Sequence, residues 1–207
     1  MKRVPLYGLA ALLLLFLLIP VRRPVRVYSE QAQVLRFQRD STPISVYDTL
    51  IRQWADSIGW DWRLVAAVIY HESRFNNNVH SNAGAKGLMQ INNSRYSDDE
   101  LLNPATNIQI GTRYLKKLEG MFADVASSAL ESRKFALAAF NMGDGKMRQL
   151  IEKARADSLD TAYWENVARE LPTGHHTRSY VRKVMDTYAD YRLKYPSHAP
   201  SDTVPTN

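Results

Sequence analysis

The sequence predicts one mainly α-helical domain, and three observations support this fold class. Apolar residues recur at intervals of three and four along most of the chain, which is the period of an amphipathic helix. Residues that cap or end helices, such as Asp61, Gly59 and the pair Asn103-Pro104, stand at the ends of these segments. There is no internal repeat and no alternating apolar and polar run long enough for a substantial sheet. We therefore expect helices with at most a minimal β element.

The composition suits one globular domain with extensions. The chain has 207 residues, of which 45% are hydrophobic and 23% charged, and it has no cysteine. Disulfides, cysteine nucleophiles, thiolate metal sites and lipid attachment through cysteine are therefore excluded. The net charge is +6, but residues 1–45 alone hold seven Lys and Arg against two acidic residues, and the other 162 residues hold 20 against 19. The body lacks the basic stripe of a nucleic-acid-binding protein, so we expect no nucleic-acid partner.

The first 20 residues are predicted to be a signal peptide or a signal anchor. Lys2 and Arg3 precede a sixteen-residue apolar run from Val4 to Ile19, which Pro20 ends. The run is slightly long for a cleavable signal peptide and slightly short for a comfortable span of about 20 residues. No small-residue cleavage site follows, so we favour an uncleaved anchor that places residues 4–20 in a membrane. The protein is then exported.

Three further regions follow this segment. Residues 21–43 contain prolines and scattered polar residues and are predicted to be a tether. Residues 44–196 are the predicted folded domain, and the short polar stretch 197–207 is predicted to be a disordered tail.

The helix that begins at Asp61 carries the first candidate for chemistry. Asp61 can cap its N-terminus, and an apolar stripe follows at helical spacing, formed by Leu64, Val65, Val68 and Ile69. Glu72 lies on the same stripe. A carboxylate on an apolar face loses solvation, so its pKa rises, or it finds a partner, or it reaches a cleft where its proton is useful. The alternative is a helix-end glutamate that turns out to solvent.

A loop rich in small residues follows this helix. Three consecutive asparagines, residues 76–78, are expected to end the helix, because their side chains compete for backbone hydrogen bonds. Gly84 and Gly87 then allow backbone conformations or close approaches that larger side chains would block. The segment 87–91 is too short for a helix and is expected to be a brief strand or a groove wall.

The other predicted helices are bounded by local signals. Ser45 and Asp48 have the spacing of a capping box, and Gly143 suits a helix C-cap that leaves Asn141 at the helix exit. Proline at the first helical position supports a start at Pro104. The expected helices cover 45–58, 103–122, 134–143, 146–156, a segment after residue 160, and 176–195.

Metal, phosphate and serine-triad chemistry find no support in the motifs. The five histidines are His71, His80, His175, His176 and His198. None fits a ligand spacing such as H-E-x-x-H, because position 75 is Phe. The glycines at 84 and 87 are not followed by the lysine and hydroxyl of a phosphate loop, and no G-x-S-x-G motif occurs. We expect no metal site and no cofactor.

The carboxylate of Glu72 remains as the candidate. Glycoside cleavage usually needs an acid with a raised pKa and a second carboxylate as base or nucleophile. The nearby cluster Asp98, Asp99 and Glu100 is interpreted as a solvated loop. If no second carboxylate exists, the sugar must supply its own nucleophile, which points away from simple hydrolysis.

An ordered set of motifs resembles the catalytic domain of the family 1 lytic transglycosylases over roughly residues 46–192. The matching pieces are Glu72-Ser73, Ser81, Gly84-Ala85-x-Gly87-Leu88-Met89-Gln90-Ile91, Ala138-Ala139-Phe140-Asn141-Met142-Gly143 and Tyr180-Val181. The resemblance implies a lyase with a goose-lysozyme-like α domain, a long groove for peptidoglycan strands and a place in the cell envelope, facing the periplasm or cell wall. It also implies cleavage of the MurNAc–GlcNAc β-1,4 bond with formation of a 1,6-anhydromuramic end.

The resemblance gives Glu72 the central role. Glu72 would be the single acid and base: it would protonate the glycosidic oxygen and later take the proton of the sugar's own O6 hydroxyl. The N-acetyl group would help as an internal nucleophile, and Tyr180 would hold or polarise Glu72. An alternative for Tyr180, which lies on an apolar stripe, is plain packing.

The resemblance also implies substrate contacts. Ser73 and Ser81 would supply hydrogen bonds near the reacting sugar, Met89 and Gln90 would line the groove, and Asn141 would contact the acetamido group of the substrate. Met89 is equally compatible with the core, and Ser73 with a helix cap.

Two positions depart from the family pattern. Phe140 stands where the family usually has Tyr, which removes a hydroxyl from that wall. His176-Thr177 stands where the family often has Glu-Thr, which changes the charge of the groove. A lysozyme-type hydrolase and a non-catalytic peptidoglycan-binding or scaffold protein remain the alternative functions, and protein partners are unassigned.

Overall fold

A computed structural model of the chain describes residues 43–196. The predicted anchor, the predicted tail and all of the predicted tether except its last residue lie outside the described residues. Within residues 43–196, no helix combines the length and the apolar character needed to cross a bilayer.

The described chain is almost entirely helical, which confirms the predicted fold class. Its helices are α3 (Asp48–Ile58), α4 (Trp62–Ser73), α5 (Asp98–Leu102), α6 (Pro104–Met121), α7 (Ala129–Met142), α8 (Asp144–Ala156), α9 (Trp164–Val167) and α10 (His176–Lys194), with a short 3₁₀ helix at Ala168–Glu170. The β structure in this part of the chain consists of two isolated bridges, which join Lys86 to His80 and to Ile91.

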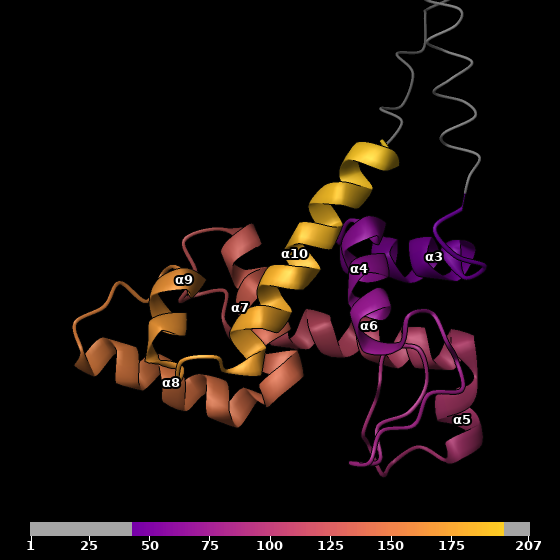
Figure 1. Ribbon diagram of the computed structural model, residues 1–207, viewed down its shortest axis with the longest axis horizontal. Coiled ribbons are helices and arrows are strands. Elements are labelled where there is room, and N and C mark those ends of the chain that lie inside the picture. Colours follow the sequence, from indigo (N-terminus) through magenta and orange to yellow (C-terminus); the bar gives the residue numbers. More distant parts are fainter. Residues whose placement is uncertain (1–42, 197–207) are drawn as a thin grey trace, which may run out of the picture. The chain divides into compact units, whose positions relative to one another are not determined.

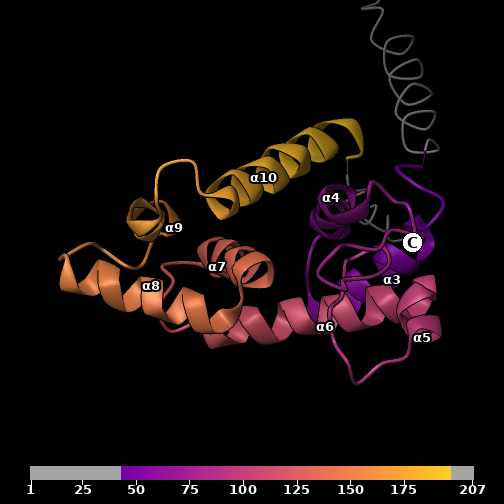
Figure 2. The same cartoon turned by 60° about the horizontal axis from the view of Figure 1, so that its bottom comes forward.

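Helix α4 lies at the centre of the core. Every side chain from Leu64 to Ile69 is completely buried, because α10 packs on one side of α4 and α3 on another. Helix α10 also packs against α7, and α7 packs against α6 and α8 (Figures 1 and 2). Since α10 contacts both α4 and α7, its side chains can reach residues near the ends of both helices.

The start of α4 is held by a partly buried cluster of polar side chains. Asp61 accepts a hydrogen bond from the backbone N–H of Arg63 at 3.0 Å, as predicted for an N-cap. The Arg63 guanidinium pairs with the same carboxylate at 2.6 Å, and the Tyr188 hydroxyl of α10 donates to it at 3.0 Å. Burial alone would raise the pKa of Asp61, but these hydrogen bonds and the Arg63 charge hold it below its usual value.

Helix α4 ends earlier than predicted. Its last residue is Ser73, and both Arg74 (φ 54°) and Phe75 (φ 59°) adopt the left-handed conformation before the three asparagines are reached. The Arg74 guanidinium lies 3.9 Å from the centroid of the Tyr70 ring, a cation–π contact that favours this turn. Glu72 is therefore in the last turn of α4.

The acidic cluster is helical, which corrects its interpretation as a loop. Asp98, Asp99 and Glu100 form the first turn of α5, where negative charge complements the helix dipole. Ser97 accepts from the Glu100 N–H at 3.3 Å, and Glu100 Oε2 accepts from the Ser97 N–H at 2.8 Å. This capping box was recognisable as S-x-x-E in the sequence.

The longer helices follow most of their predicted signals, but α3 begins at Asp48, three residues later than predicted. Its N-cap is Tyr47, with no side-chain cap hydrogen bond, so the predicted Ser45–Asp48 capping box does not form there. Asn103 caps α6 by accepting from the Thr106 N–H at 3.1 Å, and Gly143 (φ 92°) ends α7. Helix α7 begins at Ala129, five residues before its predicted start. The reason is Ser128, which caps it by accepting from the Glu131 N–H at 3.2 Å.

Candidate active site

Glu72 and Tyr180 meet where α4 packs against α10. The Tyr180 hydroxyl donates a hydrogen bond of 2.6 Å to Glu72 Oε1. Glu72 is half-buried, so its carboxylate is largely removed from water while part of it stays accessible. The residues reach this position because the stripe that buries α4 also carries Glu72, and the stripe that buries α10 also carries Tyr180.

The surroundings of Glu72 shift its titration into the neutral range. Burial raises the pKa of Glu72 to about 7, although the Tyr180 hydrogen bond acts in the opposite direction by favouring the ionised form. Burial and the neighbouring carboxylate together raise the pKa of Tyr180 well above its usual value. Tyr180 therefore stays a neutral donor, and at pH 7 Glu72 exists as both carboxylic acid and carboxylate, which suits general acid and base chemistry.

Asn141 is held by α10 as well. The Thr177 hydroxyl, which is completely buried, donates to Asn141 Oδ1 at 2.7 Å. This bond orients the side-chain amide of Asn141 at the end of α7. In the sequence, His176 stood out as a departure from the family pattern, but nothing indicated that the neighbouring Thr177 is the hydrogen-bond partner of Asn141.

The two predicted serines form hydrogen bonds within the chain. Ser73 is buried, and its hydroxyl donates to the carbonyl oxygen of Ile69 one turn earlier, at 3.2 Å. Ser81 accepts from the Ala85 N–H at 2.9 Å and so closes the turn that contains Gly84. Ser73 stabilises the end of α4 and Ser81 shapes the loop; their predicted contacts with a substrate stay predictions.

Met89 and Gln90 are adjacent but differently placed. Met89 is completely buried and packs tightly on Gly111 of α6, so its side chain belongs to the core and does not line a groove, which corrects that expectation. Gln90 (φ 48°) lines the pocket described below, and its amide donates to the carbonyl oxygens of Val79 and Gly87, both at 3.0 Å.

A buried asparagine that the sequence did not single out fixes this loop. Asn107 of α6 is completely buried, accepts from the Met89 N–H at 2.7 Å, and donates to the carbonyl oxygens of Lys86 and Leu101 at 3.0 and 2.7 Å. Gly87 (φ 75°) lies so close to Asn107 and to the Leu101 carbonyl that a Cβ there would overlap them. A glycine is therefore required at this position.

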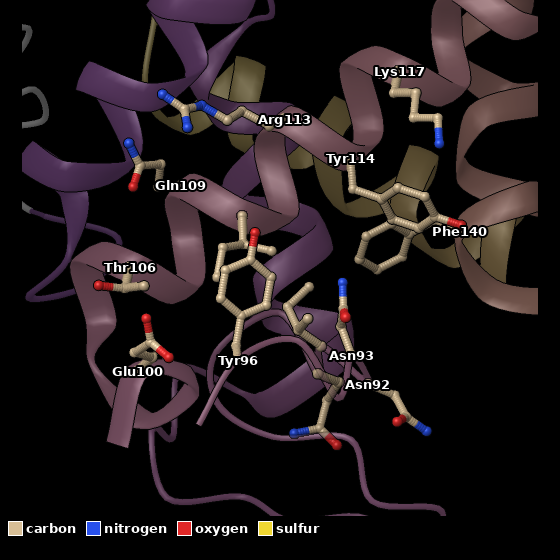
Figure 3. Close-up of a pocket in the computed structure, with 13 residues that line it drawn as sticks. Asn92, Asn93, Tyr96, Glu100, Thr106, Gln109, Arg113, Tyr114, Lys117 and Phe140 are labelled. Carbon is tan, nitrogen blue, oxygen red and sulfur yellow. The ribbon is translucent and has the colours of Figure 1, made fainter. Parts of the chain in front are cut away.

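A pocket of about 700 Å³ opens between this loop and α6 (Figure 3). Amides, hydroxyls and aromatic rings make up most of its wall, which suits a polar, ring-shaped ligand. The lining residues are Gln90, Ile91, Asn92, Asn93, Tyr96, Glu100, Thr106, Gln109, Ile110, Arg113, Tyr114, Lys117 and Phe140. Glu72 does not line it, but Phe140 does, and the next residue in the chain is Asn141. The pocket therefore reaches the end of α7, where Asn141 lies.

The comparison with known families decides between the classes of protein that such a site could serve. The sequence profile described as "Transglycosylase SLT domain" matches residues 49–162, which is more than half of the chain. The chain belongs to the transglycosylase SLT domain family. The predicted resemblance to lytic transglycosylases is thereby confirmed.

Curated relatives of this SLT domain are much longer proteins. A membrane-bound lytic murein transglycosylase F from Desulfosudis oleivorans is 35% identical over 140 residues, which cover 65% of this chain and 30% of the relative. The protein of the same name from Stutzerimonas stutzeri is 34% identical over 131 residues, which cover 61% of this chain and 26% of the relative. The chain thus spans less than a third of the length of these relatives.

Solved structures confirm the expected lysozyme-like SLT fold. The 70 kDa soluble lytic transglycosylase of Escherichia coli matches with a TM-score of 0.59 and 29% identity, over 73% of this chain and 24% of that chain. The lytic transglycosylase Slt of Pseudomonas aeruginosa, solved as an inactive mutant with glutamine in place of a glutamate, matches with a TM-score of 0.58 and 26% identity. That match covers 75% of this chain and 25% of the Pseudomonas chain.

Both departures from the family pattern lie at the edges of the site. Phe140 lines the pocket, and its ring centroid lies 5.7 Å from that of Tyr114 on α6. His176 stacks on His175 with 4.5 Å between ring centroids. The Nδ1 atom of His175 accepts from the Thr177 N–H at 3.2 Å, so His175 caps the start of α10.

Proposed function

We propose that this chain is a peptidoglycan lytic transglycosylase that cleaves the MurNAc–GlcNAc β-1,4 bond and leaves a 1,6-anhydromuramic end. The observation that carries the proposal is the half-buried pair of Glu72 and Tyr180, in which one carboxyl group has a pKa of about 7 and a fixed hydrogen-bond donor. A group with this pKa can give and take a proton at neutral pH.

Glu72 acts first as an acid. In its protonated form it donates the proton to the glycosidic oxygen as the bond to the anomeric carbon breaks, and the leaving sugar departs as an alcohol. The N-acetyl oxygen of the MurNAc residue attacks the anomeric carbon and closes an oxazolinium ring, which disperses the positive charge. Tyr180 then stabilises the carboxylate that Glu72 has become, because its hydroxyl donates to Oε1.

Glu72 acts next as a base. Its carboxylate takes the proton of the O6 hydroxyl on the same sugar while O6 attacks the anomeric carbon and the oxazolinium ring opens. The products are the anhydro sugar and a reprotonated Glu72, so no water is consumed and the enzyme returns to its starting state. One carboxyl group is sufficient, because the sugar supplies both nucleophiles.

Glu100, whose carboxylate lines the pocket, is poorly suited to act as a second base. Glu100 accepts from the backbone N–H and the hydroxyl of Ser97, at 2.8 and 3.0 Å. These hydrogen bonds hold the pKa of Glu100 below its usual value, and a carboxylate with a low pKa is a weak proton acceptor. This favours the anhydro product over hydrolysis.

We further propose that the protein works in the cell envelope, exported and held at a membrane by residues 4–20. Support comes from the apolar run of the sequence and from the relatives, which are named membrane-bound lytic murein transglycosylases. Asn141, held by Thr177, would contact the acetamido group of the substrate, and Gln90 would contact the strand in the pocket.

The test is product analysis on intact sacculi by mass spectrometry. Wild-type chain should release muropeptides with 1,6-anhydro ends, and Glu72→Gln should reduce the rate by about 10² to 10⁴, the usual contribution of acid–base assistance. Reducing ends without anhydro ends would make the protein a lysozyme-type hydrolase. Equal product release by wild type and Glu72→Gln would remove Glu72 from the mechanism, and no release by either would indicate a binding or scaffold protein.

A further inference from the structure

Two cations on one face of α6 line the same pocket as Gln90 and Phe140. Arg113 and Lys117 stand one turn apart, both are exposed, and both line the pocket (Figure 3). Neither takes part in an ion pair within residues 43–196. By contrast, Lys116, which faces away from this pocket, pairs with Glu119 at 2.8 Å. The pocket face of α6 therefore presents positive charge that no ion pair among the described residues neutralises.

Apart from the Glu100 carboxylate, which accepts hydrogen bonds from Ser97, the rest of the pocket wall suits an uncharged sugar. The side-chain amides of Asn92, Asn93 and Gln109 can exchange hydrogen bonds with hydroxyl and acetamido groups, and Tyr96 and Tyr114 offer ring surfaces. A neutral pyranose ring gives no partner to two cations. Their presence in the same pocket indicates that the bound molecule also carries anionic groups.

The two side chains differ in how they are held. The Arg113 guanidinium lies 5.6 Å from the ring centroid of Trp54, on α3, which holds it along one side of the pocket. Lys117 extends toward the side where Tyr114 and Phe140 meet (Figure 3). The two cations are thus held toward different parts of the pocket wall, and each can form a charge-assisted hydrogen bond with a carboxylate.

We propose that Arg113 and Lys117 bind carboxylates of the peptide stems that the glycan strand carries. This inference rests on the proposed function, because it takes peptidoglycan as the substrate. The sugar backbone of a strand with intact stems is neutral, and its anionic groups are the stem carboxylates. The pocket then selects strands whose stems are present and charged, and it places a stem-bearing sugar beside the bond that Glu72 cleaves.

The test is a binding measurement with two forms of one ligand. The ligand is a glycan strand with uncross-linked stems, used either with free carboxylates or after conversion of these to carboxamides. All chains are full length, kept in a neutral detergent, and carry Glu72→Gln so that the strand stays intact. Arg113→Gln with Lys117→Gln is compared with Arg182→Gln with Lys194→Gln, which removes the same charge from exposed positions of α10 outside the pocket.

We expect the chain to bind the carboxylate strand more tightly than the carboxamide strand, and we expect only Arg113→Gln with Lys117→Gln to lose this preference. Exposed ion pairs contribute about 0.2 to 1 kcal/mol each, so two of them should make the carboxylate strand bind roughly 2- to 30-fold tighter than the carboxamide strand. The control pair of substitutions should keep this ratio, and Arg113→Gln with Lys117→Gln should bring it close to one. Raising the salt concentration should reduce the ratio for the unsubstituted pocket.

Two outcomes would overturn the inference: equal binding of both strands to the unsubstituted pocket, or an unchanged ratio in the pocket variant. Circular dichroism of each variant shows whether its fold is kept. This experiment measures binding by a chain that cannot cleave, so its outcome is independent of the product analysis. If the protein were a hydrolase or a binding protein, the product analysis would contradict the proposed function, but the ratio of the two affinities could still be measured.

Discussion

Tyr180 and Glu72 are 108 residues apart in the sequence, and a hydrogen bond of 2.6 Å from the Tyr180 hydroxyl to Glu72 Oε1 joins them. The bond and the burial of the pair have opposite effects on the carboxyl group. Burial disfavours the charged form and raises the pKa to about 7, whereas the donated hydrogen bond favours the charged form. The proton affinity of Glu72 is the balance of these two effects.

Removing the donor should move this balance. In Tyr180→Phe the lowering effect is lost and the burial remains, so the pKa of Glu72 should rise above 7. The alkaline limb of the pH profile of kcat/KM should therefore shift to higher pH. The carboxylate formed on protonation of the leaving oxygen also loses a charge-assisted hydrogen bond of about 1.5 to 3 kcal/mol, so kcat should fall by roughly 10- to 100-fold.

Steady-state rates on soluble strands between pH 5 and 9 measure both effects. A Tyr180→Phe profile with an unmoved alkaline limb would mean that Tyr180 only packs against α4.

Neutralising Glu72 should change how stability depends on pH. The pKa of Glu72 is raised from 4.5 to about 7 by folding, so the folded chain holds more protons than the unfolded chain between these values. The contribution of this group to stability is complete below pH 4.5 and is lost as the pH rises to about 7, a loss of about 3 kcal/mol. Glu72→Gln cannot undergo this loss. Urea denaturation should show it more stable than wild type at pH 8 by up to about 3 kcal/mol, with the advantage smaller at pH 5.

The pH dependence of this stability difference tests whether folding raises the pKa of Glu72. If the stability difference between Glu72→Gln and wild type is the same at pH 5 and pH 8, Glu72 titrates as an ordinary surface glutamate. The candidate acid would then lack its raised pKa.

Thr177 should act through Asn141. Thr177→Val removes the buried hydroxyl that donates to Asn141 Oδ1 at 2.7 Å, while it keeps the shape of the side chain. If Asn141 binds the acetamido group equally in the ground and transition states, KM should rise by about 10-fold with kcat nearly unchanged. Thr177→Ser keeps the hydroxyl and should behave like wild type. A lower kcat with an unchanged KM in Thr177→Val would contradict this role.

Gly87 and Gly59 provide a matched pair of substitutions. Both have positive φ, 75° and 70°, so replacement by alanine costs about 1 kcal/mol at either position from backbone strain alone. At Gly59 the added Cβ meets nothing within 4 Å, whereas at Gly87 it overlaps the Leu101 carbonyl and the side chain of Asn107. Gly87→Ala should therefore lower the free energy of unfolding by about 3 kcal/mol or more, because the buried hydrogen bonds of Asn107 are disturbed.

Urea denaturation of both variants tests this difference. Equal losses at the two positions would show that the loop from 79 to 91 can shift without cost. If the prediction is correct, Gly87→Ala should also raise KM, since Gln90 and the neighbouring wall of the pocket depend on the same contacts.

Most helices were predictable because their signals are local. Asp61, Asn103 and Gly143 cap or end helices through hydrogen bonds and φ angles within a few residues, and the apolar stripes carry a helical period. The errors arose where a local signal was overlooked or where a contact overrode it. The capping box at Ser97 and the N-cap at Ser128 were not recognised in the sequence, and α4 ends at Ser73, where the Arg74 guanidinium packs on Tyr70 before the asparagines are reached.

The sequence by itself determined the helical fold class, the family and the identity of Glu72 as the candidate acid, because period, caps and ordered motifs can all be recognised along one dimension. Only the tertiary structure decided the proton affinity of Glu72, since desolvation and the Tyr180 bond depend on how α4 packs against α10. It also decided that Met89 lies in the core and that Arg113 and Lys117 share a pocket with Gln90, because burial depends on which neighbouring helix covers each side chain.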